Sequence, residues 1–219
     1  MSITPEQSEQ PGTRVWDLPV RVFHWALVAL VLSQVITATI GGNAMQYHVL
    51  GGYSILTLVL FRVVWGFIGG RHARFANFLK GPRSVVRYAA SVIRGNHERH
   101  AGHNPLGGWS VMLMLVSLLV QTGSGLFADD DVMTSGPLAK HVSDHTVSLL
   151  TRVHDANAFV LLTLVAVHIV AVLFYLIARR DNLIGPMITG RKRSTSTPPV
   201  SGTEGGSDWT ALLILIASG

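Results

Sequence analysis

The chain has 219 residues, of which 48% are apolar and only 13% are charged, against roughly 25% charged residues in an average soluble domain. So few charges could not cover the surface of a soluble protein of this size, so the composition disfavours a soluble enzyme and favours a membrane protein. The net charge is +5 and the chain has no cysteines. This excludes disulfides, thiolate clusters, thioether attachment of a cofactor and a cysteine nucleophile.

Four apolar runs are long enough to cross a bilayer, which takes about 20 residues. They cover approximately Val22–Ile40, Tyr47–Ile68, Gly107–Phe127 and Asn157–Ala178. We therefore predict an all-α, integral membrane four-helix bundle that forms one domain over residues 1–193. Residues 194–219 are predicted to form a flexible linker and a short hydrophobic tail. Within that tail, Trp209–Ala217 is too short to span, so it is either an interfacial segment or part of a truncated fifth helix.

The loops between these runs alternate in charge. The first, Gly41–Gln46, has no Lys or Arg, whereas the second, Arg71–His103, has seven against a single Glu98. The third loop is acidic, and a basic stretch follows the fourth run. By the positive-inside rule, both termini are cytoplasmic and the acidic third loop lies outside. The basic excess is therefore interpreted as membrane topology rather than as a nucleic-acid surface.

One stretch of the second loop has its own helical pattern. Apolar residues recur at helical spacing over Ser84–Ile93, with arginines around them, and Pro82 suits the first turn of a helix. This predicts an amphipathic helix, which either lies on the inner leaflet or packs against the protein.

Ten histidines are the main candidate ligands. Six lie in or beside the loops, where solvated or weakly structural roles are expected; these are His72, His97, His100, His103, His141 and His145. The other four, one or two to a run, lie in or at the start of apolar runs; these are His24, His48, His154 and His168. A lone histidine in a membrane can simply be hydrogen-bonded between helices, but four of them form a functional hypothesis.

The helix directions place these four histidines at two depths. His154 and His168 are 14 residues apart, close to four turns, so they share a helix face and lie about 21 Å apart along the axis. The second and fourth runs go from outside to inside, and the first goes from inside to outside. His48 is therefore expected opposite His154 at the outer level, and His24 opposite His168 at the inner level.

Two imidazoles at one depth on facing helices form an axial pair for a planar tetrapyrrole such as haem. A single four-histidine metal site is excluded by the vertical separation, because a zinc or copper ion needs its ligands within about 2 Å. A proton relay through the four histidines lacks an acidic group between the two levels. The residues thus predict two haem b groups with bis-histidine ligation.

Small residues and one arginine fit this hypothesis. Gly51 and Gly52 follow His48 by one turn, and Gly123 and Gly125 lie in the outer half of the third run. These glycines either leave room for a cofactor or allow ordinary close helix contacts. Arg62 lies 14 residues after His48, on the same face at the inner level. It either pairs with a haem propionate or extends to the inner headgroups.

The motifs resemble a known family. The run Arg21-Val-Phe-His24-Trp25, the run His48-Val-Leu-Gly51-Gly52 and the pair His154 and His168 together resemble the bacterial cytochrome b561 family. That family includes the b-type cytochrome subunits of nickel–iron hydrogenases. The resemblance covers about residues 14–193.

The resemblance implies a multi-pass cytochrome of the bacterial inner membrane that moves single electrons between a quinone pool and a redox partner at the outer surface. The partner would be a hydrogenase-like subunit or a cytochrome c, the quinone is expected on the inner side near His103 and Arg62, and a homodimer stays open. This favours an electron-transfer subunit over a stand-alone enzyme. The alternative is a quinone-linked oxidoreductase acting on a small species such as superoxide, which the acidic outer loop disfavours. A third alternative, a transporter or proton channel, would contain no haem.

Overall fold

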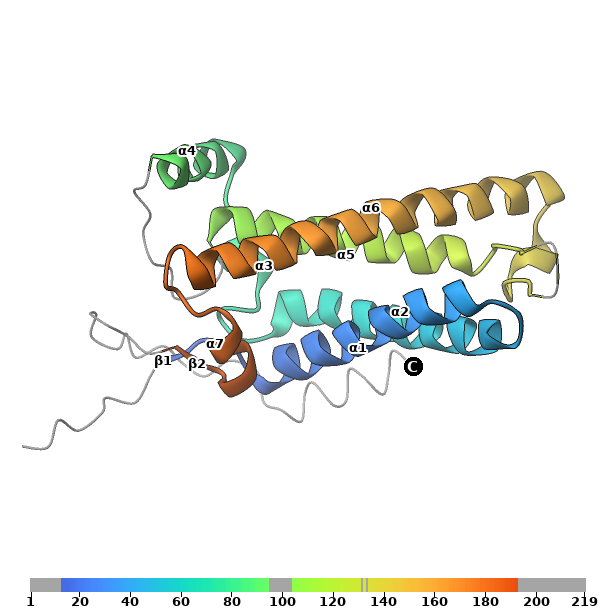
Figure 1. Ribbon diagram of the computed structural model, residues 1–219, viewed down its shortest axis with the longest axis horizontal. Helices are drawn as coiled ribbons and strands as arrows, with labels where there is room; N and C mark the ends of the chain where they lie inside the picture. The colour runs from blue at the N-terminus through green and yellow to red at the C-terminus, as the bar shows by residue number, and fades with distance from the viewer. Residues whose placement is uncertain (1–12, 95–103, 131, 133, 193–219) are drawn as a thin grey trace, which may run out of the picture.

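The computed structural model describes residues 13–94, 104–130, 132 and 134–192, and this part of the chain is mostly helical (Figure 1). Its long helices are α1 (Leu18–Ile40), α2 (Met45–Ile68), α5 (Pro105–Gly125) and α6 (Asp144–Ile177). All four are long and apolar enough to cross a membrane. The predicted all-α bundle with four membrane-spanning helices is therefore confirmed. The linker, the hydrophobic tail Trp209–Ala217, and His97, His100 and His103 lie outside the described residues.

The long helices form two antiparallel hairpins. Helix α1 packs along α2 and α5 packs along α6, while α2 and α5 join the two hairpins. Both hairpin connections lie at one end of the bundle (Figure 1). The described part of the connection from α2 to α5 lies at the opposite end, where it contains the short helices α3 (Phe75–Phe78) and α4 (Pro82–Ile93).

Local capping chemistry sets where three of the long helices begin. Asp17, Asn104 and Ser143 each cap one helix, and their side-chain oxygens accept a backbone N–H three residues later at 3.0, 2.7 and 3.3 Å. The turn from α1 to α2 uses Gly41 and Gly42 at φ values of 64° and 52°. These left-handed conformations favour glycine because it has no Cβ. A 3₁₀ turn, Gly42–Ala44, then leads into α2.

One long helix begins well before the span that was predicted for it. The first three spans begin and end within four residues of their predicted positions, but α6 begins at Asp144 rather than near Asn157. Its 34 residues extend about 51 Å, against a hydrocarbon core of about 30 Å. Asp144, predicted to lie in the acidic loop, is in the first turn of α6, where its charge suits the helix dipole. Hydropathy marks only the apolar part of such a helix, whereas its cap marks the start.

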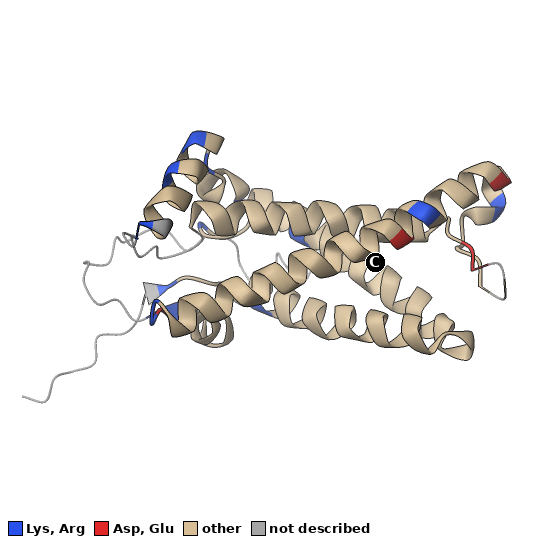
Figure 2. Ribbon diagram, turned by 45° about the horizontal axis from the view of Figure 1, so that its top comes forward, with Lys and Arg blue, Asp and Glu red and all other residues tan. Residues whose placement is uncertain are grey.

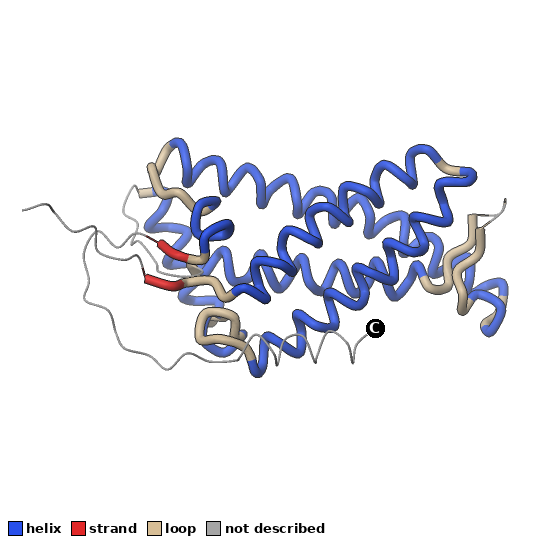
Figure 3. Tube along the Cα trace, turned by 90° about the horizontal axis from the view of Figure 1, so that it is seen from below, coloured by secondary structure: helices blue, strands red, loops and turns tan. Residues whose placement is uncertain are grey.

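At the end of the bundle opposite the hairpin connections, the segment before α1 pairs with the segment that follows α6 and α7. Strand β1 (Thr13–Arg14) pairs antiparallel with β2 (Arg191–Lys192), with Thr13 opposite Lys192. The two strands lie side by side in Figure 3. Helix α7 (Ile184–Thr189) precedes β2, and the Trp25 indole of α1 donates to the Met187 carbonyl at 3.2 Å. The segment after α6 is thereby fixed against the base of α1.

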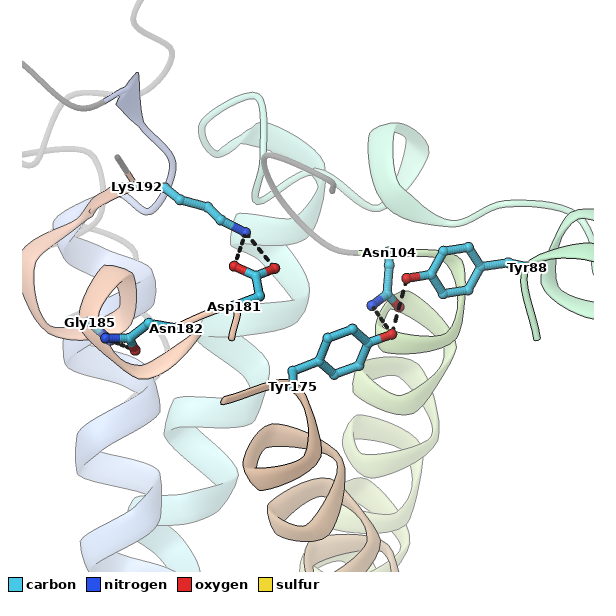
Figure 4. Close-up of polar contacts among 7 residues, drawn as sticks. All are labelled: Tyr88, Asn104, Tyr175, Asp181, Asn182, Gly185 and Lys192. Carbon is cyan, nitrogen blue, oxygen red and sulfur yellow. Dashed lines mark hydrogen bonds and ion pairs between the residues drawn. The ribbon is translucent and has the colours of Figure 1, made fainter. Parts of the chain in front are cut away.

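The predicted amphipathic helix is present as α4, and one face of it packs against the protein. Its Tyr88 hydroxyl lies 3.0 Å from the hydroxyl of Tyr175 in α6, which also accepts from Asn104 Nδ2 at 3.2 Å (Figure 4). Arg179 donates to the Val92 carbonyl at 2.7 Å. Burial and the bond with Tyr175 raise the pKa of Tyr88 above its usual value. Arg83 and Arg87 on the other face are exposed.

Buried apolar side chains concentrate on α2 and on the segments that cover its inner half. Val59 and Trp65 have no exposed surface, and Leu115 and Leu118 of α5 are each 4% exposed. Helices α1 and α6 have few buried residues and expose large apolar side chains such as Phe159, 76% exposed. Such an apolar exterior is expected for helices in contact with lipid.

Charged residues lie mostly at the two ends of the bundle. Lys and Arg residues gather at the end that contains α4, β1 and β2, and acidic residues of the α5–α6 connection lie at the other end (Figure 2). The helical spans between them are almost free of charge. The arrangement matches the charge pattern from which the orientation was predicted.

Candidate functional site

The predicted outer histidines face each other. His48 lies in the first turn of α2 and His154 in the outer part of α6, and their ring centroids are 6.3 Å apart with an interplanar angle of 77°. Both side chains are half-buried. Two helices from different hairpins thus bring two imidazoles together at one depth of the bundle.

Backbone carbonyls hold the Nδ1 atoms of both rings. His48 Nδ1 donates to the Gln34 carbonyl of α1 at 3.2 Å, and His154 Nδ1 donates to the Gln121 carbonyl of α5 at 2.9 Å. A carbonyl oxygen can only accept, so each Nδ1 has the proton and each Nε2 has the lone pair. This is the tautomer in which a histidine coordinates a metal through Nε2.

The predicted inner histidines lie on α1 and α6. Both His24 and His168 are half-buried, and the charge of His168 would act on the His24 ring. The His24 ring meets the Trp25 ring edge-on at a centroid distance of 5.1 Å. Within the described part of the chain, His24 Nδ1 is a buried atom without a hydrogen-bond partner. A buried unpaired nitrogen is costly unless something else satisfies it.

The two pairs lie at separate levels. His154 and His168 are both on the uninterrupted helix α6, so their 14-residue separation corresponds to about 21 Å. The described residues contain no group of three or more His, Asp or Glu side chains that could hold a metal ion. The histidines are arranged as two pairs.

The glycines near the outer pair fall into two kinds. A Cβ on Gly51 would lie 2.1 Å from Gln34 Nε2, and a Cβ on Gly125 would lie 2.8 Å from His154 Cε1. Gly51 and Gly125 therefore serve close packing. A Cβ on Gly52 or Gly123 would meet nothing within 4 Å among the described residues. Gly52 is one turn from His48, so this open space adjoins the outer pair.

Arg62 is buried at the inner end of α2. It is 3% exposed, its Nη2 donates to the Ala73 carbonyl at 3.2 Å, and its guanidinium lies 5.1 Å from the Phe75 ring centroid. The charge of Asp17 also interacts with it. Its buried Nη1 has no hydrogen-bond partner among the described residues. This burial argues against extension of the side chain to the headgroups.

Sequence reasoning missed a polar network next to His154. Asn157 Nδ2 donates to the Ser117 carbonyl at 2.9 Å and to Gln121 Oε1 at 2.7 Å, and the Ser117 hydroxyl donates to Asn157 Oδ1 at 3.1 Å. The Gln121 amide in turn lies 3.1 Å from His154 Nε2. Polar side chains inside apolar spans are rare and functional by default, so Gln34, Gln121 and Asn157 could have been selected by that signal.

Three of the histidines that were expected in or beside the loops lie among the described residues. His141 and His145 are exposed near the α5–α6 connection. His72 is half-buried after α2, where burial, assisted by the charge of Arg71, lowers its pKa below the ordinary 6.5.

The comparison with known families finds one family whose model matches most of the chain. A model of the family described as prokaryotic cytochrome b561 matches residues 15–190, which include both histidine pairs. The chain belongs to the prokaryotic cytochrome b561 family. It is thus a b-type cytochrome, an integral membrane protein of electron transfer whose family binds haem b.

Curated relatives of this cytochrome are named "Probable Ni/Fe-hydrogenase B-type cytochrome subunit". Those of Bradyrhizobium diazoefficiens and Rhizobium leguminosarum bv. viciae are each 24% identical, over 84% of this chain and 87% and 90% of their own lengths. That of Azotobacter chroococcum is 24% identical over 83% of this chain and 89% of its own length. No solved structure is significantly similar to the cytochrome.

The donor chemistry of the outer pair suits a haem iron. His48 and His154 would hold it through Nε2, because each Nδ1 is bound to a backbone carbonyl, and their ring centroids are 6.3 Å apart. The Gln121 amide, which now donates to His154 Nε2, would have to turn aside for iron to bind there. The open space at Gly52 is a further feature that a haem would fill.

Proposed function

We propose that this cytochrome holds two haem b groups, one between His48 and His154 and one between His24 and His168. The observation that supports it most is the outer pair, whose neighbouring rings both have Nδ1 bound to a backbone carbonyl. Haem iron, when bound, exchanges single electrons by alternating between two oxidation states. Protein ligands on both sides of the iron favour electron transfer over oxygen chemistry.

Different residues would hold the outer and the inner haem. His48 and His154 hold the outer group, with Gly52 leaving room beside it, and His24 and His168 hold the inner group. The buried guanidinium of Arg62 is the cation available to an inner propionate, because its Nη1 has no protein partner among the described residues. Charge-assisted bonds of this kind are strong in a low-dielectric interior.

The two ends of the bundle would meet different redox partners. We infer that the basic end faces the cytoplasm of a bacterial inner membrane and the end of the α5–α6 connection faces outward. The outer haem would exchange electrons with a hydrogenase-like subunit, as the names of the relatives suggest, or with a cytochrome c. The inner haem would exchange electrons with a quinone.

Haem stoichiometry and single-histidine variants test this function. The purified protein should contain two b haems per chain in a pyridine haemochrome assay. His48→Ala and His154→Ala should each remove the outer haem and retain the inner one, while His24→Ala and His168→Ala should do the reverse. His141→Ala, in the exposed outer connection, is the matched control and should retain both. One haem per chain, or loss of the same haem from the His24 and His48 variants, would contradict the proposal.

A further inference from the structure

The same pair of polar residues accompanies each outer histidine on the neighbouring helix. On α1, Gln34 is followed three residues later by Thr37, and both lie beside His48. On α5, Gln121 is followed three residues later by Ser124, and both lie beside His154. Each hairpin thus supplies one histidine and one glutamine–hydroxyl pair.

The two arrangements agree contact by contact. The distance from the histidine Nδ1 to the glutamine carbonyl is 3.2 Å for His48 and 2.9 Å for His154. The distance from Nδ1 to the hydroxyl oxygen is 3.4 Å in both. The hydroxyl of Thr37 also donates to the carbonyl four residues before it at 2.8 Å, and that of Ser124 does so at 2.6 Å.

These contacts fix where the protons lie. Because each hydroxyl proton points to the carbonyl four residues earlier, the hydroxyl oxygen can present only a lone pair to the imidazole. The glutamine carbonyl likewise can only accept. Each outer Nδ1–H therefore has two acceptors, one strong and one weaker, and each Nε2 is left as the metal-binding atom.

At the inner level, His24 has no such acceptors for its Nδ1 among the described residues. In the part of the chain that the structure describes, His24 Nδ1 is buried without any acceptor. A histidine that donates its second N–H to an acceptor is a more basic ligand, and such partners tune the bound metal. A more basic ligand stabilises the oxidised, more positive iron and so lowers its reduction potential.

We propose that the backbone carbonyls of Gln34 and Gln121, together with the hydroxyls of Thr37 and Ser124, hold both outer imidazoles as Nδ1 donors and thereby lower the midpoint potential of the outer haem. Thr37 and Ser124 are then matched positioning residues. The proposal rests on the proposed function, since it requires a haem between His48 and His154. Hydroxyls that bond back to their own helix are common without any such role. Thr39 is an example on α1, where its hydroxyl bonds to the Val35 carbonyl at 2.7 Å and its side chain is exposed.

Removal of the two hydroxyls from the full-length haem-loaded protein tests the proposal. Thr37→Val and Ser124→Ala each take one acceptor from an outer Nδ1–H, so a redox titration should show an upward shift of the outer midpoint. The double variant should show a larger shift, and the inner midpoint should not move. Thr37→Ser and Ser124→Thr retain a hydroxyl and should restore the wild-type value. Thr39→Val is the matched control and should leave both midpoints unchanged.

A second measurement reports the tautomer directly. In the reduced, low-spin protein labelled with ¹⁵N-histidine, NMR should detect a proton on Nδ1 of both His48 and His154. An unprotonated Nδ1 on either residue would overturn the proposal, even if the variants lose haem. So would an unmoved outer midpoint in a double variant that retains two haems. Wild-type protein without two haems would instead defeat the proposed function.

Discussion

Substitution by alanine at two glycines on one turn of α5 should affect the outer haem in opposite ways. A Cβ on Gly125 would lie 2.8 Å from His154 Cε1 and 3.1 Å from its Nδ1, whereas ordinary contact begins near 3.4 Å. In Gly125→Ala, the ring and the helix must therefore separate by about 0.6 Å. An imidazole ring is stiff, and metal-ligand distances are held to within about 0.2 Å. The displacement is large enough to disturb iron coordination.

The effects of the two substitutions on the free energy of unfolding can be compared as well. Gly to Ala within a helix stabilises by about 1 kcal/mol, whereas overpacking of a well-packed contact costs about 1–3 kcal/mol. Gly125→Ala should therefore be destabilising on balance. Gly123→Ala gains the same helix propensity and meets nothing within 4 Å among the described residues, so it should be neutral or stabilising.

Haem content and the optical spectrum measure the outcome. Gly125→Ala should reduce the haem content from two toward one per chain through loss or loosening of the outer group, with the inner midpoint unchanged. Gly123→Ala should bind haem as the wild type does. If Gly125→Ala retained two haems with an unmoved outer midpoint, the contact between this glycine and the ligand ring would have no functional weight, and the reasoning would be refuted.

Three further results are expected. Arg62→Gln should lower the inner midpoint and leave the outer one nearly unmoved, because a negative propionate loses its cation, and Arg62→Lys should do less; two unchanged midpoints would remove Arg62 from the site. The His72 imidazole should titrate below pH 6.5 by NMR, and because the unfolded chain binds that proton more tightly, acidification through this range should cost stability that His72→Gln retains. The 77° angle between the His48 and His154 rings predicts a strongly anisotropic low-spin EPR signal for the outer haem, and a signal typical of parallel rings would contradict it.

The histidine pairs were predictable because helix geometry links sequence spacing to depth. Four apolar runs, their loop charges and the 14-residue separation of His154 and His168 were enough to assign each histidine a level and a partner. The beginning of α6 was not predicted, because the outer turns of that helix contain Arg152 and Asp155, which lower hydropathy without breaking a helix. The Ser143 cap, a local signal, would have located it.

The contacts of Arg62 could not be predicted from the sequence, for a different reason. Spacing placed Arg62 at the inner level, but its contacts come from Ala73 and Phe75, which follow a turn after α2, and from Asp17 at the base of α1. The carboxylate of Asp17 also accepts from the Trp65 indole at 3.1 Å. Such contacts depend on how separate segments fold over the inner end, which no periodicity encodes.

The polar network around His154 links assembly of the bundle to the geometry of the ligand. Helix α6 has a single buried residue, Leu161, and packs along α5. The bonds from Asn157 to Ser117 and Gln121 add polar contacts to this packing, and the backbone carbonyl of Gln121 also holds His154. Interhelical bonds in membranes are individually worth about 1 kcal/mol. A shift of α6 that breaks them therefore also moves the imidazole, so the register of the two helices and the placement of the outer ligand are set by the same contacts.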